Sequence, residues 1–484
     1  MEKKNLYILI IILGIVGVGG GLGIYYLIQG LNIPPAPEQD IFAIYGPGTT
    51  GNYTMTMTEL QSTKYVQVTN QEFITKNYVG EIVSNGNYSG VSLRSILEEE
   101  SLLGLFAENF TGIGLDGFNP GVMYGMLNIS DVMNNDYALC IIAYGGPDFN
   151  SEDDAPLKLM INQSIIDISI RAQRYCVKQL ASIYIAEKDI LTIYGSGVIS
   201  TFGMTMTELQ STKYIQVTNQ EFYTRNFEGV VVSSGFYSGV SLRSVLEEES
   251  LLKQYVENYT GIGSDDYNPG AIWGMLNISD VMNNDYALCI IAYGGTDFDP
   301  IDDAPLKLMI NQSIVLPTIR ASRYCVKSLA SIFIAEKEIL EIYGTGVIGS
   351  YGMTLTELQS SDYVQIINQE FFTLNYLSEI VSNGNYSGVS LRSILEEEGL
   401  LAPGAENYTG IGLDDYNPGD IWGMLNISDV MNNDYDQCII AYNGPDFDPL
   451  GDVPLKLMIN QSIVLPSIRA SRYCVRNLAS ILIE

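Results

Sequence analysis

Hydrophobic and polar positions along this chain form one pattern that occurs three times. The segment SNGNYSGVSLRSILEEE begins at Ser84 and returns unchanged at Ser382, and a close variant, SSGFYSGVSLRSVLEEE, begins at Ser233. Each copy therefore starts 149 residues after the one before it. A period of this length is that of a whole domain, whereas solenoid repeats are only about 20 to 50 residues long. The pattern predicts three tandem domains that each bury a core of their own.

The positions within one repeat predict a mostly β, α+β domain. Residues 64–73 alternate between apolar and polar side chains, as a half-buried strand does, and three longer apolar runs (ALCIIAY, PLKLMIN and RYCVKQLASIYI) predict further strands. Thr56 and Glu59 have capping-box spacing at the start of a short helix. The segment SNGN predicts a turn, Ser92 the N-cap of a helix with one apolar face, and Ser130 the cap of another short helix.

Domain boundaries follow from the repeat and from the composition around it. They place the repeat domains at residues 41–187, 188–336 and 337–484, after a Pro-rich spacer at residues 29–40 and an N-terminal segment at residues 1–28. The last predicted strand of one repeat leads almost directly into the first strand of the next, so linkers are nearly absent.

The N-terminal segment predicts a membrane anchor. An uncharged run of 23 residues begins at Leu6 and ends at Ile28, which is long enough for a helix to cross the roughly 30 Å of hydrocarbon in a bilayer. Lys3 and Lys4 precede the run and favour a cytoplasmic N-terminus, so we expect a single-pass protein of the cell membrane whose repeats lie outside the cytoplasm. A cleaved signal peptide is the alternative, but its apolar region is normally shorter and is followed by a small-residue cleavage site.

Charge and the absence of histidine exclude several functions. The sequence holds 24 Lys and Arg against 56 Asp and Glu, a formal net charge of -32, so nucleic acid is not expected as a partner. The excess of acid either keeps the protein in solution or suits a cationic partner. Without histidine, a Ser-His-Asp or Cys-His catalytic centre is not available, although carboxylate pairs or a bound cofactor remain open.

Cysteines occur two to a repeat and always 36 residues apart. In an oxidising compartment the simplest interpretation is one disulfide inside each repeat, which would stabilise the domain by about 4 kcal/mol. Six buried apolar thiols are the alternative, because the cysteines lie in strand-like runs. The predicted pairs are Cys140 with Cys176, Cys289 with Cys325, and Cys438 with Cys474.

Sequons for N-glycosylation are frequent. Glycans are expected on them if the repeats lie outside the cell, although some matches arise by chance in a chain rich in Asn, Ser and Thr. The sequons lie at Asn52, Asn87, Asn109, Asn128, Asn162, Asn258, Asn277, Asn311, Asn385, Asn407, Asn426 and Asn460.

Each repeat also holds an acidic loop: DFNSEDD, DFDPIDD and DFDPLGD. Several carboxylate or amide oxygens within seven residues suit a hard cation such as calcium. The fixed glycine and the closing Glu of an EF-hand are missing, and a solvated acidic turn is the alternative. The candidate ligands are Asp148, Asp153, Asp154, Asp297, Asp299, Asp302, Asp303, Asp446, Asp448 and Asp452.

Five segments of the repeat resemble the sulfite oxidase-type molybdopterin-binding domain. GVSLRSILEEE resembles the family's segment that enters a short helix, and GLDGF, DYALCIIAYGGPDF, APLKLMI and RYCVKQLASIYI resemble four of its strands in order. The resemblance covers most of each repeat and implies three tandem domains of this fold. It also implies that both cysteine-bearing strands belong to one core, with the paired cysteines near the roughly 5.5 to 6 Å Cα separation that a disulfide prefers.

The chain departs from that family at the catalytic cysteine. Family enzymes supply a thiolate to molybdenum from a cysteine shortly before the G-V-x-L segment, and no repeat has a cysteine there. We therefore expect a membrane-anchored extracytoplasmic protein that is not catalytic, needs no cofactor, and binds a protein or small molecule or serves cell-surface architecture. Two alternatives stay open: a molybdopterin-dependent oxidoreductase and a calcium-stabilised surface or adhesion protein.

Overall fold

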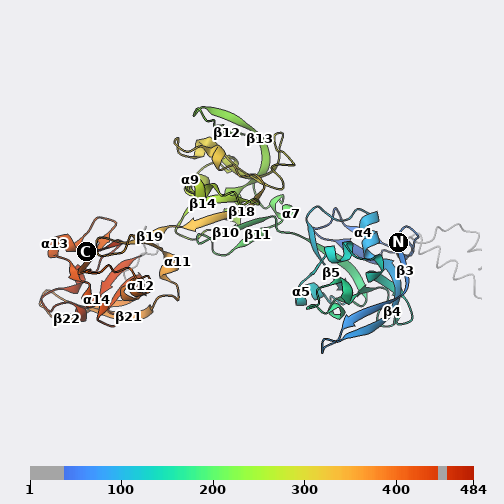
Figure 1. Ribbon diagram of the computed structural model, residues 1–484, viewed down its shortest axis with the longest axis horizontal. Coiled ribbons are helices and arrows are strands. Elements are labelled where there is room, and N and C mark those ends of the chain that lie inside the picture. The colour runs from blue at the N-terminus through green and yellow to red at the C-terminus, as the bar shows by residue number, and fades with distance from the viewer. Residues whose placement is uncertain (1–37, 445–454) are drawn as a thin grey trace, which may run out of the picture. The chain divides into compact units, whose positions relative to one another are not determined.

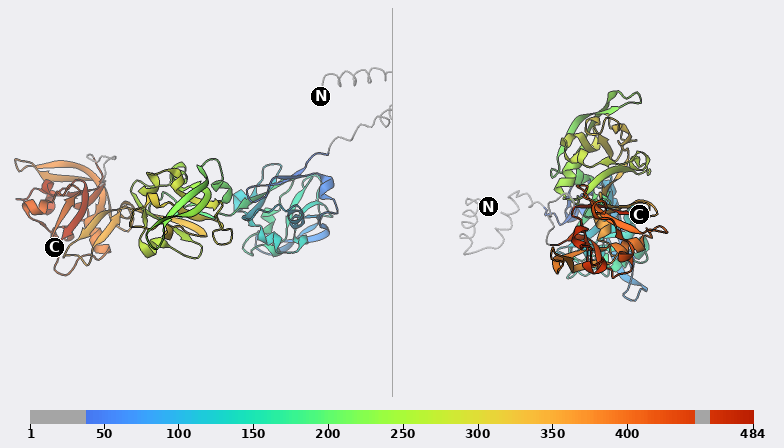
Figure 2. Two further views of the ribbon diagram at one scale, coloured as in Figure 1. Left: turned by 90° about the horizontal axis from the view of Figure 1, so that it is seen from above. Right: turned by 90° about the vertical axis from the view of Figure 1, so that its left-hand side faces the viewer.

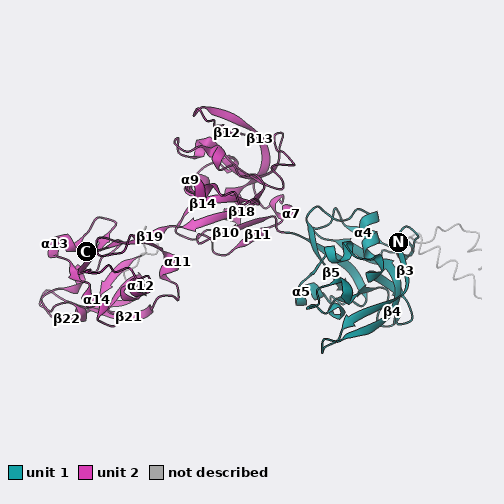
Figure 3. Ribbon diagram, in the orientation of Figure 1, with its two compact units in different colours: residues 1–188 teal, residues 189–484 magenta. Residues whose placement is uncertain are grey.

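A computed structural model describes residues 38–444 and 455–484 (Figure 1). The predicted anchor, most of the spacer, and the loop residues Asp446, Asp448 and Asp452 lie outside this range. No helix within it has the length and apolar character that crossing a membrane requires. The chain divides into two compact units, Met1–Lys188 and Asp189–Glu484, and the second unit contains two of the three repeats (Figure 3).

Two β-sheets form the framework of the first repeat. The five-stranded sheet has the order β2-β1-β9-β5-β6, in which β1 and β9 are parallel and all other neighbours are antiparallel. The four-stranded sheet has the order β3-β4-β7-β8 and is entirely antiparallel. The strands are β1 (Phe42–Tyr45), β2 (Tyr53–Met55), β3 (Gln67–Lys76), β4 (Ile82–Ser92), β5 (Ala107–Gly114), β6 (Leu127–Asn128), β7 (Cys140–Gly145), β8 (Lys158–Ile161) and β9 (Leu180–Glu187).

The second and third repeats have the same two sheets (Figure 2). In the second repeat the strands are β10 (Leu191–Tyr194), β11 (Phe202–Met204), β12 (Gln216–Arg225), β13 (Val231–Ser241), β14 (Val256–Gly263), β15 (Leu276–Asn277), β16 (Cys289–Gly294), β17 (Lys307–Ile310) and β18 (Leu329–Glu336). In the third they are β19 (Glu338–Tyr343), β20 (Tyr351–Thr354), β21 (Gln365–Leu374), β22 (Ile380–Ser390), β23 (Asn407–Gly412), β24 (Leu425–Asn426), β25 (Cys438–Asn443), β26 (Lys456–Ile459) and β27 (Leu478–Ile483). The prediction of a mostly β chain with three similar repeats is confirmed, and the likeness to the sulfite oxidase domain stays a prediction.

The α-helices are short and fill the connections between strands. The first repeat has α3 (Met57–Leu60), α4 (Leu93–Glu99), α5 (Pro120–Tyr124) and α6 (Ser130–Met133). The second has α7 (Met206–Leu209), α8 (Leu242–Glu248), α9 (Pro269–Trp273) and α10 (Ser279–Met282), and the third has α11 (Leu355–Leu358), α12 (Leu391–Glu397), α13 (Pro418–Trp422) and α14 (Ser428–Met431). Single 3₁₀ turns complete the repeats, at η1 (Tyr137–Leu139), η2 (Gln163–Ile165), η3 (Ala172–Tyr175), η4 (Tyr286–Leu288), η5 (Gln312–Ile314), η6 (Ala321–Arg323), η7 (Gln461–Ile463) and η8 (Ala470–Arg472).

Two of the three predicted helix starts are confirmed. Thr56 and Glu59 form a full capping box on α3, and the Ser92 side chain caps α4 by accepting the N–H of Ser95. Ser130 is not a cap but the first residue of α6, and its N–H is accepted by the side chain of Asn128 at 2.8 Å.

The strand β7 separates two hydrophobic cores. Cys140 and Ile142 face the large core between the two sheets, whereas Ile141 and Ala143 face a smaller core on the other side, with Phe73. All four β7 residues are buried, as expected for a strand that is covered on both faces.

The segment SNGN is not a turn. It lies inside β4, where Gly86 has a φ of 104° and the register with β3 shifts, so the segment is a β-bulge. The hairpin between β3 and β4 turns at residues 77–81 instead, where the N–H of Asn77 donates to the carbonyl of Glu81 at 2.9 Å. A bulge and a turn both favour Gly and Asn, so the local sequence does not distinguish them.

A glutamate at the end of one repeat caps the first helix of the next. Glu336 ends β18 and accepts the N–H and the hydroxyl of Thr356 in α11 at 3.2 and 2.5 Å. Lys253 lies 3.6 Å from the same carboxylate. Before the first repeat, Glu38 accepts the N–H of Thr58 in α3 at 3.1 Å in the same way.

Gly90 marks a close approach of β4 and β7. A Cβ at this position would lie 2.2 Å from the carbonyl oxygen of Ile142. We expect Gly90→Ala to destabilise the first repeat by about 1–3 kcal/mol, because the two strands must separate to admit the methyl group. Chemical unfolding of the full chain, followed by circular dichroism, measures the effect. Gly51→Ala is the matched control, since no atom lies within 4 Å of its Cβ position, and an equal loss in both variants would contradict the explanation.

Candidate functional site

A short helix presents an aromatic residue at the surface of each repeat. In the second repeat α9 begins after Asn268, whose side chain accepts the N–H of Ala271, and Pro269 occupies its first turn. Thr260 of β14 accepts the N–H of Gly270 at 3.0 Å and donates to the Asn268 side chain at 3.3 Å. The helix is thereby attached to the five-stranded sheet, and its last residue, Trp273, has a defined position.

Two tyrosines hold Trp273 from either side. The Trp273 ring lies edge-on to Tyr267 and to Tyr324, with centroid distances of 6.3 and 6.5 Å. The Tyr267 hydroxyl donates to the carbonyl of Arg323 at 2.9 Å, and the Tyr324 hydroxyl donates to the carbonyl of Gly274 at 2.9 Å. Because both hydroxyls bind backbone, the three rings are fixed without a ligand.

An arginine covers one face of the aromatic residue. The guanidinium of Arg323 lies 5.1 Å from the centroid of the Trp273 ring, within the range of a cation–π interaction. Arg472 lies at the same distance over Trp422, and Arg174 lies 4.7 Å over Tyr124. Within the part of the chain that the structure describes, none of these three guanidinium groups forms an ion pair with a carboxylate.

We call this feature the aromatic–arginine surface. Its members are equivalent in the three repeats and come from the loop before the short helix, from the helix itself and from the segment before the last strand. They are Phe118, Tyr124, Arg174 and Tyr175; Tyr267, Trp273, Arg323 and Tyr324; and Tyr416, Trp422, Arg472 and Tyr473.

The aromatic–arginine surface is open to solvent and has apolar neighbours. Trp273 and Trp422 are each 42% exposed, and Ile272 and Ile421 beside them are each 57% exposed. The first repeat has Val122, Met123 and Met126 exposed around Tyr124. A cluster of exposed apolar side chains on an ordered element marks an interaction site more often than scattered apolar residues do.

Sequence reasoning missed the aromatic–arginine surface, although two signals were present. The chain holds only two tryptophans, and both occupy the same position of the repeat. Asn-Pro-Gly stands shortly before each tryptophan and gives the one-turn helix a rigid start. Gly-Met-Leu-Asn follows each tryptophan directly, and its glycine ends the helix sharply. The arginines lie 50 residues further along the chain, so their contact with the rings follows only from the fold.

The acidic loops contain a carboxylate with a structural task. Asp148 accepts the backbone N–H of Asn87 at 2.7 Å and packs against Gly86, and so supports the bulge in β4. In the second repeat Asp297 accepts the N–H of Phe236 at 2.8 Å. This oxygen is therefore already bound to backbone in both described loops.

A second carboxylate of the loop belongs to a buried Asp–Lys–Tyr cluster. Lys158 of β8 donates to Asp154 at 3.2 Å and to the hydroxyl of Tyr88 at 3.0 Å, and all three residues are buried. In the second repeat Lys307 donates to Asp303 at 3.0 Å and to Tyr237 at 3.1 Å.

Burial alone would lower the pKa of both lysines, because it disfavours the charged form. The hydrogen bond from each lysine to its tyrosine, together with the nearby aspartate, outweighs that effect and raises the pKa of Lys158 and Lys307 above the ordinary value. Both lysines are therefore charged at neutral pH, and each neutralises a buried aspartate.

Asp299 accepts the N–H of Ile301 at 2.8 Å, and two further loop carboxylates lie beside surface lysines. Asp153 is 3.5 Å from Lys178, and Asp302 is 3.3 Å from Lys327. Within residues 38–444 and 455–484, no three His, Cys, Asp or Glu side chains converge as a metal site. The candidate aspartates of the two described loops thus face lysines and backbone N–H groups, and calcium binding stays a prediction.

The predicted disulfides are absent, since all six cysteines are free thiols. Cys140 faces the large core, whereas Cys176 lies in a loop before β9 and its thiol is directed at the carbonyl oxygens of Ala172 and Ile161 at 3.5 and 3.8 Å. The sequence placed Cys176 in a strand, but that strand begins only at Leu180. Burial raises the pKa of Cys176 and of its counterpart Cys325 to about 11, so these thiols are protonated at neutral pH.

Three of the twelve sequons are inaccessible, which corrects the prediction of glycans on them. Asn162, Asn311 and Asn460 are 4, 5 and 6% exposed, and Asn162 and Asn311 each accept the N–H of a following serine. A glycan does not fit on a buried side chain of the folded protein. The other nine asparagines are exposed or half-buried, and glycosylation there stays a prediction.

Neither protein-family models nor curated proteins match this chain.

The Asp303–Lys307–Tyr237 cluster predicts a large effect of one substitution. Lys307→Met should destabilise the second repeat by about 3–5 kcal/mol, because the buried Asp303 carboxylate loses its buried cation and keeps only the surface Lys327 at 3.9 Å. The double variant Asp303→Asn, Lys307→Met should recover most of the loss, since Asn can still accept the N–H of Asp299. Urea unfolding of the full chain at pH 7 gives these values.

Lys178→Met, which removes an exposed ion pair with Asp153 in the first repeat, is the control and should cost less than about 1 kcal/mol. The gap between wild type and Lys307→Met should persist up to about pH 10.4, the ordinary lysine pKa, and shrink only as the pH rises through the raised pKa of folded Lys307. A gap that closes near neutral pH would contradict this assignment.

Thiol reactivity provides a second test. Purified protein should react slowly with a thiol reagent while folded, because three of its cysteines are buried, the other three are half-buried, and the thiol pKa values are raised. After unfolding in guanidinium chloride, all six cysteines of the chain should react with the reagent. A count that falls short by two, four or six would show that pairs are oxidised.

Proposed function

We propose that this chain is a non-catalytic, multivalent binding protein that contacts a protein partner through its three aromatic–arginine surfaces. The observation that carries the proposal is the occurrence of one exposed, preorganised surface at the same place in all three repeats. The membrane anchor, the extracytoplasmic placement of the repeats and the likeness to the sulfite oxidase domain belong to the proposal as predictions from the sequence.

The composition of the surface supports a protein partner. Trp, Tyr and Arg are the residues that contribute most often to the affinity of protein interfaces, and Met is also enriched in them. The rings lie edge to face and an arginine covers one face of each tryptophan, so they do not form the flat open platform that stacks on a sugar ring. Because backbone bonds fix the tyrosines beforehand, little side-chain entropy is lost on binding.

Tandem repetition supports multivalent binding. Three equal surfaces on one chain can engage a partner that is itself repeated, and linked weak contacts give a much stronger total interaction. This advantage does not require any single surface to bind tightly.

The side chains available argue against catalysis of the sulfite oxidase type. Every cysteine is placed in or beside a hydrophobic core, and none lies in the segment from which that family supplies its metal thiolate. Metal analysis of the purified chain tests this point, because stoichiometric molybdenum or tungsten would contradict a purely binding role.

Photo-crosslinking at the surface tests the binding role directly. We expect p-benzoylphenylalanine at position 422, in the full chain expressed in its own cells, to form an adduct of higher mass after irradiation. The control places the same group at Ile348, which is 70% exposed and lies outside the aromatic–arginine surface. Mass spectrometry of the adduct identifies the partner, and equal adduct yields at positions 422 and 348 would refute the proposal.

A further inference from the structure

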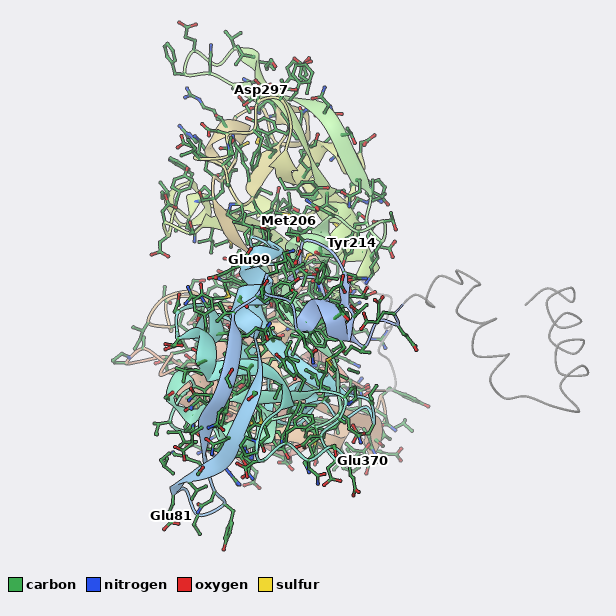
Figure 4. The ribbon with its side chains drawn as sticks, turned by 90° about the vertical axis from the view of Figure 1, so that its right-hand side faces the viewer. Glu81, Glu99, Met206, Tyr214, Asp297 and Glu370 are labelled. Carbon is green, nitrogen blue, oxygen red and sulfur yellow. The ribbon has the colours of Figure 1, made fainter. Side chains whose placement is uncertain are left out.

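A second exposed apolar surface lies at the far end of the β-hairpin in each repeat. We call it the hairpin tip and define it as residues 77–83, 226–232 and 375–381. In Figure 4 the labelled Glu81 lies at the end of the β3–β4 hairpin, away from the rest of the first repeat. The aromatic residues of the three hairpin tips, Tyr78, Phe227 and Tyr376, are 86, 81 and 79% exposed.

Aliphatic side chains surround each of these aromatic residues. Exposed neighbours are Val79, Ile82 and Val83 in the first repeat, Val230, Val231 and Val232 in the second, and Leu377, Ile380 and Val381 in the third. Such side chains contribute nothing to the cores, because they lie beyond the part of the hairpin that the small core covers. An interaction with a partner outside the repeat therefore explains why these apolar side chains are exposed.

One asparagine makes each hairpin tip rigid. The side chain of Asn77 accepts the N–H groups of Val79 and Glu81 at 3.0 and 2.9 Å. Asn226 and Asn375 hold their loops with the same pair of bonds. The exposed ring is thus carried on an ordered loop, which lowers the entropic cost of docking it.

Each hairpin tip also carries one glutamate. In the first and third repeats Glu81 and Glu379 accept the side-chain N–H of the loop asparagine, at 3.0 and 2.9 Å. Glu228 occupies the tip of the second repeat. In the described part of the chain no lysine or arginine forms an ion pair with these three carboxylates.

The hairpin tip and the aromatic–arginine surface are complementary. The tip offers an exposed aromatic ring, aliphatic neighbours and a carboxylate that no described lysine or arginine pairs with. The surface offers exposed aromatic and aliphatic side chains and a guanidinium that no described carboxylate pairs with. Each of the three repeats carries both a hairpin tip and an aromatic–arginine surface.

We infer that the occupant of the aromatic–arginine surface is the hairpin tip of a second copy of this chain. The inference rests on the proposed function and specifies its partner. Each repeat carries one tip and one surface, so two chains offer one another several such contacts. The net charge of -32 opposes association in general, whereas the arginine-bearing surface attracts the acidic tip of a second chain.

Charge reversal tests the contact. One variant of the full chain carries Arg174→Glu, Arg323→Glu and Arg472→Glu, and the other carries Glu81→Arg, Glu228→Arg and Glu379→Arg. We expect wild type to self-associate reversibly in sedimentation velocity, and each variant alone to associate at least about ten-fold more weakly, because each now opposes like charges across the contact. An equimolar mixture of the two variants should associate again, because opposite charges meet at both halves of the contact. Recovery in the mixture also shows that both variants are folded.

Wild type that stays monomeric at every concentration, or variants that stay apart when mixed, would overturn the inference. This failure is distinct from failure of the proposed function. If the crosslinker at position 422 then captures a different protein, the aromatic–arginine surface is a binding site and the second copy is not its occupant. If self-association survives both charge reversals alone, the chains meet elsewhere and the inference is wrong.

Discussion

Burial of one strand on both faces is the constraint on which each repeat depends, and in the first repeat this strand is β7. Its alternate residues supply a large core on one side and a small core on the other, and its backbone approaches β4 so closely that Gly90 cannot carry a side chain. The small core, built around Phe73 and Tyr88, holds the base of the β3–β4 hairpin. The hairpin can extend beyond the body of the repeat because its base is fixed in this way, so an exposed feature depends on a buried one.

The period, the β-rich class and two helix caps follow from the sequence because they depend on local spacing alone. The features that the sequence did not reveal depend on partners far away in the chain. SNGN forms a bulge because Asp148, 61 residues later, supports it. The acidic loop looks like a cation site in the sequence, because the lysines that pair with it cannot be recognised there. Lys158 and Lys178 become its partners only in the folded chain. The aromatic–arginine surface was missed for the same reason.

The three repeats keep one architecture and vary its surface chemistry. Tyr124 takes the place of Trp273 and Trp422, and Phe118 takes the place of Tyr267 and Tyr416, so the first repeat lacks both the larger ring and one hydroxyl bond to backbone. Tryptophan binds a cation more strongly than tyrosine does, which makes the second and third surfaces the stronger arginine holders. The three aromatic–arginine surfaces therefore differ in how strongly their aromatic residue binds the arginine.

The glutamate between successive repeats has a thermodynamic consequence. Glu336 is the last residue of a strand in the second repeat, and its carboxylate caps α11 of the third. When that strand detaches, the start of α11 loses two hydrogen bonds. Part of the free energy of unfolding is thus shared between neighbours, as in the nearest-neighbour coupling of linear repeat arrays, so damage to the second repeat is transmitted to the third.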